Sequence, residues 1–451
     1  RFPEGEARLV EARRVAPEVF ERIPELAAAW AKVLARRDPQ QAMRWIERFL
    51  LRFPDAREVA ELRLLRADLL RSRNPRLALA AYAKLAADFP ETNAGRLARL
   101  RQWMLEARHL RDAEAIRRYI QRIDAWGARF QLSPVEDEAH WDLARLWARI
   151  ARPEKATDPA LKHAWLAAQG SEATVRAKAR AWAKRRFADI VQHALDGGDD
   201  STIAQLVRAY PTLMPTPQKA PRLVVRIADA LRRVGRWEEA ERWIRQVLRA
   251  HPEGPAADEA RLVLARLFLD RGQAEQAPRL LRWAERMADP ARHAEIAVVA
   301  ASLFVRVGAH SQALAQLAAV PVDLLSASGK RLYWETRAEA EEALHHWREA
   351  AASWENAFGA GAARAWLWSA DAWLEAGAPH RARQVLARVP KAQRDRAWRY
   401  HWAQALAETG DLRAAEQSWA EVAQGDDAYA QAARLMLSVI RASKLVQGAR
   451  R

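Results

Sequence analysis

Between residues 221 and 451, an alanine and a glycine recur in a fixed relation, and this register constrains the fold of the 451-residue chain more than any other feature. The alanines are separated by 37, 36, 37, 32 and 33 residues and lie at Ala240, Ala277, Ala313, Ala350, Ala382 and Ala415. Five residues before each alanine lies Gly235, Gly272, Gly308, Gly377 or Gly410, except in the fourth copy, which has His345. Such a period predicts an array in which each unit contacts only its neighbours.

The unit from Pro221 to Pro252 is predicted to form two short antiparallel helices. One apolar stripe at helical spacing precedes Gly235 and a second follows it; the stripes are Val224, Ile227, Ala228 and Leu231, then Ala240, Ile244 and Val247. Gly235 supplies the turn, and Pro252 ends the second helix. In the fourth copy, we expect the turn to form without the conformational freedom of glycine, because His345 replaces it.

This hairpin, and its GRWEEA turn at 235–240 in particular, resembles the tetratricopeptide repeat (TPR). The resemblance implies an all-α fold, a right-handed α-solenoid of TPR-like helical hairpins whose first helices line a concave groove. The phrase AAYAKLAADFPETNAGRLA at 80–98 is also similar to hairpins in TPR proteins of the bacterial cell envelope, namely the envelope-assembly lipoproteins and the Tol-Pal-associated coordinator of cell division.

Three regions are predicted along the chain. Residues 1–126 form N-terminal TPR-like hairpins, in which Ala42 and Ala78 mark second helices and Ala115 and Tyr119 mark a weaker third unit. Residues 127–220 are a divergent helical segment that ends in the Pro-rich joint PTLMPTPQKAP, where no helix can continue. Residues 221–451 form six TPR-like hairpins with a C-terminal capping helix. The prediction is therefore two arrays joined by a divergent helical segment.

Composition limits the partner and the location. The net charge of +17 suits a polyanion, although an Arg-rich composition of genomic origin explains it as well. Cysteine is absent, and no apolar run is long enough to span a bilayer. Because the chain begins at Arg1 rather than Met, we expect a signal peptide, an anchor or another segment to have been removed. A periplasmic or envelope-associated location follows, with a cytoplasmic one as the alternative.

The sequence contains no convergent catalytic motif. A phosphate-binding loop and a dinucleotide fingerprint are absent, and His345 with Glu349 lacks a third metal ligand. We therefore expect no catalytic residues, no metal, no cofactor and no small-molecule substrate.

Function is instead expected at surfaces. Polar and apolar positions on the first helices predict a groove for another protein, an envelope or membrane component; the candidates are Arg222, Val225, Asp229, Arg232, Glu259, Leu262, Arg266, Ser302, Glu335 and Glu339. Solvation of an exposed helix face explains these residues equally well. A basic helix face could bind an acidic polymer or an anionic lipid surface through Arg176, Arg180, Lys184 and Arg185.

The leading hypothesis is a non-enzymatic scaffold for protein–protein interactions in a bacterial envelope machine, such as outer-membrane assembly, polysaccharide export or an appendage. Two alternatives remain. The phrase WRYHWAQALAETGDLRAAEQSW at 398–419 is similar to hairpins in the α-superhelical domain of peptidoglycan-processing lytic transglycosylases. The basic helix face predicts a polyanion-binding protein.

Overall fold

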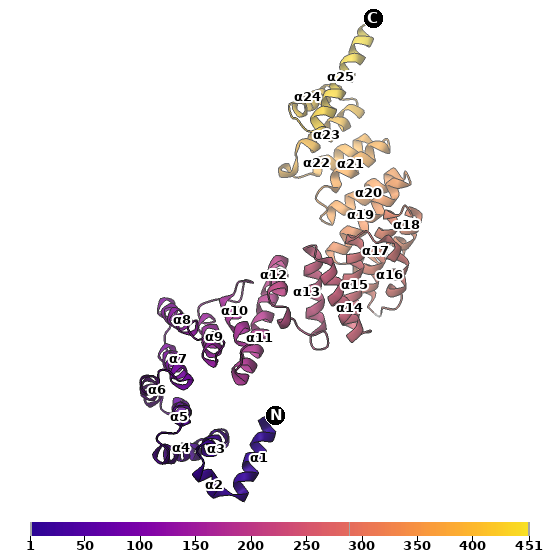
Figure 1. Cartoon of the computed structure of the whole chain (residues 1–451). Coiled ribbons are helices and arrows are strands. Elements are labelled where there is room, and N and C mark those ends of the chain that lie inside the picture. The colour runs from indigo at the N-terminus through magenta and orange to yellow at the C-terminus, as the bar shows by residue number, and fades with distance from the viewer. Residues whose placement is uncertain (1, 288, 450–451) are drawn as a thin grey trace. The chain divides into compact units, whose positions relative to one another are not determined.

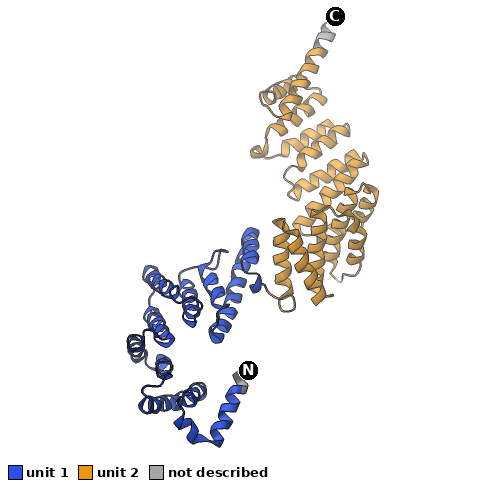
Figure 2. Cartoon of the chain, in the orientation of Figure 1, with its two compact units in different colours: residues 1–214 blue, residues 215–451 orange. Residues whose placement is uncertain are grey.

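The computed structural model describes residues 2–287 and 289–449, and within these ranges it consists of helices and the turns between them, with no strand (Figure 1). The chain divides into two compact units (Figure 2), unit 1 at residues 1–214 and unit 2 at residues 215–451. The boundary between the units falls in the Pro-rich segment at 211–221. In both units, helices that follow one another in sequence pack as hairpins.

Unit 1 contains α1 (Phe2–Val15), α2 (Pro17–Arg22), α3 (Pro24–Arg37), α4 (Pro39–Arg52), α5 (Val59–Arg73), α6 (Pro75–Asp88), α7 (Asn93–Ala107), α8 (Ala113–Gly127), α9 (Pro134–Trp147), α10 (Pro159–Ala167), α11 (Ala173–Gly197), α12 (Asp200–Ala209) and the 3-10 turn η1 (Pro211–Leu213).

Unit 2 contains α13 (Pro221–Arg233), α14 (Trp237–Ala250), α15 (Pro255–Asp270), η2 (Ala274–Gln276), α16 (Ala277–Ala284), α17 (Pro290–Arg306), α18 (His310–Ala318), η3 (Val322–Leu324), α19 (Ala327–Ala343), α20 (Trp347–Gly359), α21 (Ala365–Glu375), α22 (Pro379–Arg388), η4 (Lys391–Gln393), α23 (Arg396–Glu408), α24 (Leu412–Val422) and α25 (Ala428–Ala449).

Many helices begin with the same local device, a polar capping side chain followed by proline. Asp38 accepts hydrogen bonds from the backbone N–H groups of Gln40 and Gln41 at 2.9 and 3.0 Å, immediately before Pro39 opens α4. The side chain of Asn74 caps α6 in the same way ahead of Pro75. These pairs fix where each helix starts, because the cap satisfies free N–H groups and proline has no N–H to leave unsatisfied.

The predicted repeat register is confirmed at the turn and at the helix contact. Gly235, Gly272, Gly308, Gly377 and Gly410 all have φ between 67° and 88°, where a side chain is strained. The six alanines that follow them are fully buried, which lets the two helices of each hairpin approach closely. His345 differs from the expectation, because it adopts the same left-handed conformation with a φ of 59°. The fourth turn therefore has the same left-handed backbone conformation as the glycine turns, and His345 is strained in it.

First helices also contact one another within each unit. In unit 1 the row runs through α3, α5, α7 and α9, and α9 contacts α11. The divergent residues from 134 onward thus belong to the same packed unit as the N-terminal hairpins. The third hairpin is shifted by one residue from the predicted register: Ile116 and Ile120 are buried, whereas Ala115 and Tyr119 are partly exposed. Asp112 caps α8 at Ala115, so this position lies in the first turn of the helix.

In unit 2 the row of first helices runs through α13, α15, α17 and α19, and farther along α21 contacts α23. The last helix, α25, packs on α23 and α24 and covers a small core around Trp419 and Ala433. The protein is therefore an all-α solenoid of TPR-like hairpins. Among the helices described, none combines the length and apolar character needed to cross a membrane.

Candidate functional site

The first helices of unit 2 carry the predicted groove residues, and three of these are not available at the surface. Val225, Leu262 and Ser302 are buried. The reason is that α13, α15 and α17 pack against one another and against their own second helices, so these positions face neighbouring helices. The prediction that these three residues contact a partner therefore requires correction. Arg222 is exposed and forms no hydrogen bond or ion pair with any described residue.

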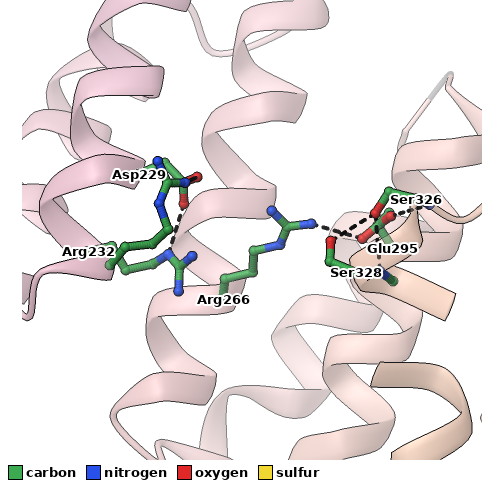
Figure 3. Close-up of polar contacts among 8 residues, drawn as sticks. Asp229, Arg232, Arg266, Glu295, Ser326 and Ser328 are labelled. Carbon is green, nitrogen blue, oxygen red and sulfur yellow. Dashed lines mark hydrogen bonds and ion pairs between the residues drawn. The ribbon is translucent and has the colours of Figure 1, made fainter. Parts of the chain in front are cut away.

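Several predicted charged residues tie neighbouring first helices together. On α13, Arg232 donates to Asp229 at 2.9 Å and also pairs with Asp270 at the end of α15. Figure 3 shows Arg232 beside Asp229, and Arg266 of α15 directed at Glu295 of α17. The distance from the Arg266 guanidinium to Glu295 is 3.0 Å.

Glu295 is buried and receives a second hydrogen bond. Its other carboxylate oxygen accepts from the backbone N–H of Ser326 at 2.8 Å, where the chain enters α19. One carboxylate therefore joins three consecutive first helices, α15, α17 and α19. Glu259 of α15 forms a more exposed pair of the same kind, with Arg292 of α17 at 3.3 Å. These contacts stabilise the row, so the side chains concerned have a structural role.

Glu335 and Glu339 of α19 have a different environment, because carboxylates gather around them. We name Glu335, Glu339, Glu342 and Asp371 the carboxylate strip. Burial raises the pKa of Glu339, and the neighbouring Glu335 raises it further, while the charge of Arg306 opposes the shift. Burial also raises the pKa of Glu342, to which Asp371 and Glu339 add, although the hydrogen bond from the Trp354 indole opposes the shift.

Few cations balance the carboxylate strip. Burial raises the pKa of Glu335, and only Arg331, 4.0 Å away on the same helix, opposes it. Asp371 lies 2.6 Å from Nδ1 of the buried His401. The strip is thus a series of like charges on a protein whose net charge is +17. Its members are partly buried except Glu339, which is exposed. A cationic group placed on it would lower the mutual repulsion of the carboxylates.

The predicted basic helix face lies on α11 of unit 1. Arg176 is occupied, because it donates to the carbonyl oxygens of Gly170 and Ser171 at 2.7 and 2.9 Å. Arg180, Lys184 and Arg185 are exposed and form no hydrogen bond or ion pair among the residues described. The adjacent Arg186 is buried against Asp158 at 2.7 Å. Three of the four predicted cations therefore remain available to a ligand.

Unit 1 also contains a pocket that the sequence did not predict. It has a volume of about 700 Å³ and opens between α5, α7 and α9. Five arginines and three carboxylates contribute to its lining: Arg71, Arg101, Arg108, Arg145 and Arg149, with Asp68, Glu138 and Asp142. Arg71, Arg108 and Arg145 recur at equal intervals in the sequence, one on or just after each of the three helices. This spacing is the signal that could have revealed the pocket.

A partly buried ion network forms one wall of this pocket. Arg101 of α7 donates two hydrogen bonds to Glu138 of α9, at 2.9 and 3.0 Å, and pairs with Asp68 of α5. Tyr82 donates to the same Asp68 at 2.6 Å. Burial favours a protonated Glu138, but the charge of Arg101 outweighs it and the pKa of Glu138 is lowered. The network therefore holds the three helices in register with paired charges.

Asp142 is the exception in this pocket. Only 2% of the residue is exposed, and its Oδ2 atom has no hydrogen-bond partner, while Oδ1 accepts from Arg145 at 3.2 Å. Burial, together with the charge of Glu138, raises the pKa of Asp142 to about 8. At neutral pH this carboxyl group is protonated, and its Oδ2 can donate a hydrogen bond that nothing in the described chain accepts.

No protein-family model matches the chain, and no curated protein matches it. Similar solved structures include the Cut9–Hcn1 hetero-tetramer of the APC/C, at 12% identity and a TM-score of 0.38, covering 96% of this chain and 94% of that one.

Two further structures are similar at this level. The human IFIT1 dimer with m7Gppp-AAAA has 13% identity and a TM-score of 0.35, covering 89% and 85% of the two chains. The P58(IPK) TPR domain has 14% identity and a TM-score of 0.30, covering 94% and 99%.

Proposed function

We propose that the protein is a non-catalytic scaffold that binds a partner protein along the first helices of unit 2, and that the carboxylate strip receives basic side chains of that partner. Solenoids built from helical repeats present extended surfaces suited to this role. The observation that carries the proposal is the strip itself. Glu335 and Glu342 are partly buried, burial raises the pKa of Glu335, Glu339 and Glu342, and the cations that oppose these shifts are Arg331 and Arg306.

The alternative explanation of the strip is simple solvation of an exposed helix face. That explanation fits Arg222, which is exposed. It fits the strip less well, because Glu335 and Glu342 are only partly exposed, and partial burial of their charges is unfavourable. A lysine or arginine from a partner would relieve this cost and bring charge-assisted hydrogen bonds. The carboxylate strip is therefore expected to favour a basic or amphipathic segment.

The test compares capture by the tagged chain and by the triple variant Glu335→Gln, Glu339→Gln and Glu342→Gln. The matched control is Glu238→Gln, Glu253→Gln and Glu285→Gln, which removes the same charge from exposed residues outside the strip. We expect a defined protein, identified by mass spectrometry, to bind the parent chain and the control but to bind the strip variant at least tenfold more weakly. Equal capture by all three chains would contradict the proposal.

We further propose that this partner belongs to a bacterial envelope machine. The support is the resemblance of residues 80–98 to hairpins of envelope TPR proteins. Fractionation of cells that express the natural gene tests the location: recovery with the periplasm or the envelope is expected. A full-length cytoplasmic pool that holds the same partner would count against it.

A further inference from the structure

We propose that the pocket between α5, α7 and α9 binds a small organic anion that carries at least two carboxylate or phosphate groups, held by Arg71, Arg108 and Asp142. Nothing in the carboxylate strip of unit 2 requires this second site. The inference is therefore independent of the proposed scaffold function.

The sign of the ligand follows from the lining. Arginines outnumber carboxylates by two in the pocket, and Arg101 is already paired with Glu138 and Asp68. Arg71 and Arg108 are exposed and form no hydrogen bond or ion pair within the described ranges. A cationic ligand drawn to Asp142 would have to approach these arginines. An anion instead gains the planar guanidinium donors, which match carboxylate and phosphate oxygens.

The structural alternative for these arginines is stabilisation of helix ends. Arg149 has that role, because it donates to the carbonyl oxygen of Ala107 at the end of α7, at 2.8 Å, and to that of Leu110 just after this helix. Arg71 and Arg108 occupy comparable places at the ends of α5 and α7 but make no such bonds. Their N–H groups therefore remain free of hydrogen bonds, although the charge of Arg71 acts on the carboxylates of the pocket.

Asp142 supplies the second, independent observation. A buried polar atom without a partner costs free energy, so most such atoms in proteins are paired with protein, water or ligand. The Oδ2 atom of Asp142 is unpaired in a pocket wall between helices that are otherwise well tied. Because Oδ2 itself is fully buried, the side chain must turn toward the pocket before it donates, as a protonated carboxyl group, to an anion oxygen of the ligand.

The extent of the pocket favours a small ligand over a peptide. All its lining residues belong to α5, α7, α9 or the residues just after them, and none comes from α3 or α11 at either side of the row. The volume of about 700 Å³ is within the range of small-molecule sites, roughly 300–1,000 Å³. A peptide that followed the row of first helices would need contacts beyond these three.

The site also predicts how binding depends on pH. The charged groups that act on Asp142 are Glu138 and Arg145 of its own helix, Arg101 of α7 and Arg71 of α5. Glu138 favours protonation, and the arginines oppose it. Because burial and Glu138 raise the pKa of Asp142 to about 8, raising the pH above this value replaces a donor in the pocket wall with a negative charge. Affinity for an anion should therefore fall above pH 8.

The experiment is isothermal titration calorimetry of the full chain with citrate and with pyrophosphate. We expect saturable binding at one site per chain for at least one of the two. The double variant Arg71→Gln and Arg108→Gln should weaken it at least tenfold. The control, Arg73→Gln and Arg111→Gln, removes the same charge from exposed arginines of unit 1 outside the pocket, and its affinity should stay within twofold of the parent. Equal weakening in the control would show attraction by net charge and overturn the proposal.

Asp142→Asn tests the carboxyl group separately, because asparagine keeps a donor at the Oδ2 position. Binding should persist in this variant and should no longer weaken above pH 8. The absence of saturable binding for both anions would overturn the proposal. So would one-site binding of an octaglutamate peptide when neither small anion binds, because this result would assign the pocket to acidic protein segments instead.

Discussion

At the scale of single residues, the fourth hairpin turn has a strained backbone at His345 and a contact between the side chains of His345 and Trp347. His345 has a φ of 59°, and its ring lies 5.3 Å from that of Trp347. The left-handed conformation costs a residue with a Cβ about 1–2 kcal/mol, a cost that glycine avoids. The other five turns have glycine at this place. The repeat therefore tolerates a strained histidine where its own pattern favours glycine.

We predict that His345→Gly is more stable than His345→Ala by about 1 kcal/mol, since both lose the ring contact and only alanine keeps the strain. The measurement is the urea midpoint followed by tryptophan fluorescence. The control is the exposed residue Ala352 within α20. There the parent alanine should be more stable than Ala352→Gly, because glycine costs about 1 kcal/mol of stability inside a helix. If alanine equalled or exceeded glycine at position 345, the turn would have a different conformation.

At the scale of helices, the hairpins are held in a row by a few polar ties between first helices. Glu295 is the central one, because it is buried and joins α15, through Arg266, to the start of α19. We predict that Arg266→Met destabilises the row by about 2 kcal/mol. This is below the ~3–5 kcal/mol typical of a broken buried pair, because Arg266 is itself partly exposed.

This loss is measured by hydrogen exchange in α15 and α17, where a loss of about 2 kcal/mol corresponds to roughly 30-fold faster exchange through local opening. Arg292→Met is the control, since it breaks the more exposed pair with Glu259 between the same two helices and should cost under about 1 kcal/mol. Equal effects of the two substitutions would show that burial of Glu295 does not matter to the row.

The sequence predicted the hairpins of residues 221–451, but it did not predict every buried position or the pocket. Glycine and alanine spacing was sufficient for the hairpins of residues 221–451, because a left-handed turn favours glycine and a close helix contact favours alanine. The shift to Ile116 and Ile120 was missed, since an apolar pair one residue away satisfies the same spacing. The groove prediction was wrong at Val225, Leu262 and Ser302, because contacts between successive first helices bury them. The pocket needed three helices in space, which no single motif specifies.

At the scale of the whole molecule, the excess of positive charge does not by itself identify a binding surface. The chain carries 74 Lys and Arg against 57 Asp and Glu, yet the carboxylate strip of unit 2 lies on the same protein. Charge spread over the surface attracts any polyanion weakly, whereas a local face binds through a fixed number of phosphate contacts. Arg180, Lys184 and Arg185 on α11 are the predicted face that is exposed and unpaired in the described structure.

We predict that Arg180→Glu, Lys184→Glu and Arg185→Glu together weaken binding of a short single-stranded DNA and lower the slope of log affinity against log salt by about 2, since each lost contact contributes about 0.7. The control triple Arg44→Glu, Arg57→Glu and Arg76→Glu changes net charge equally at exposed sites away from α11. Fluorescence anisotropy at several salt concentrations measures both slopes. A loss confined to the α11 triple would establish a local polyanion face. Equal losses in the two triples would mean that the molecule attracts polyanions through its total charge, because only the number of removed cations, and not their position, would then matter.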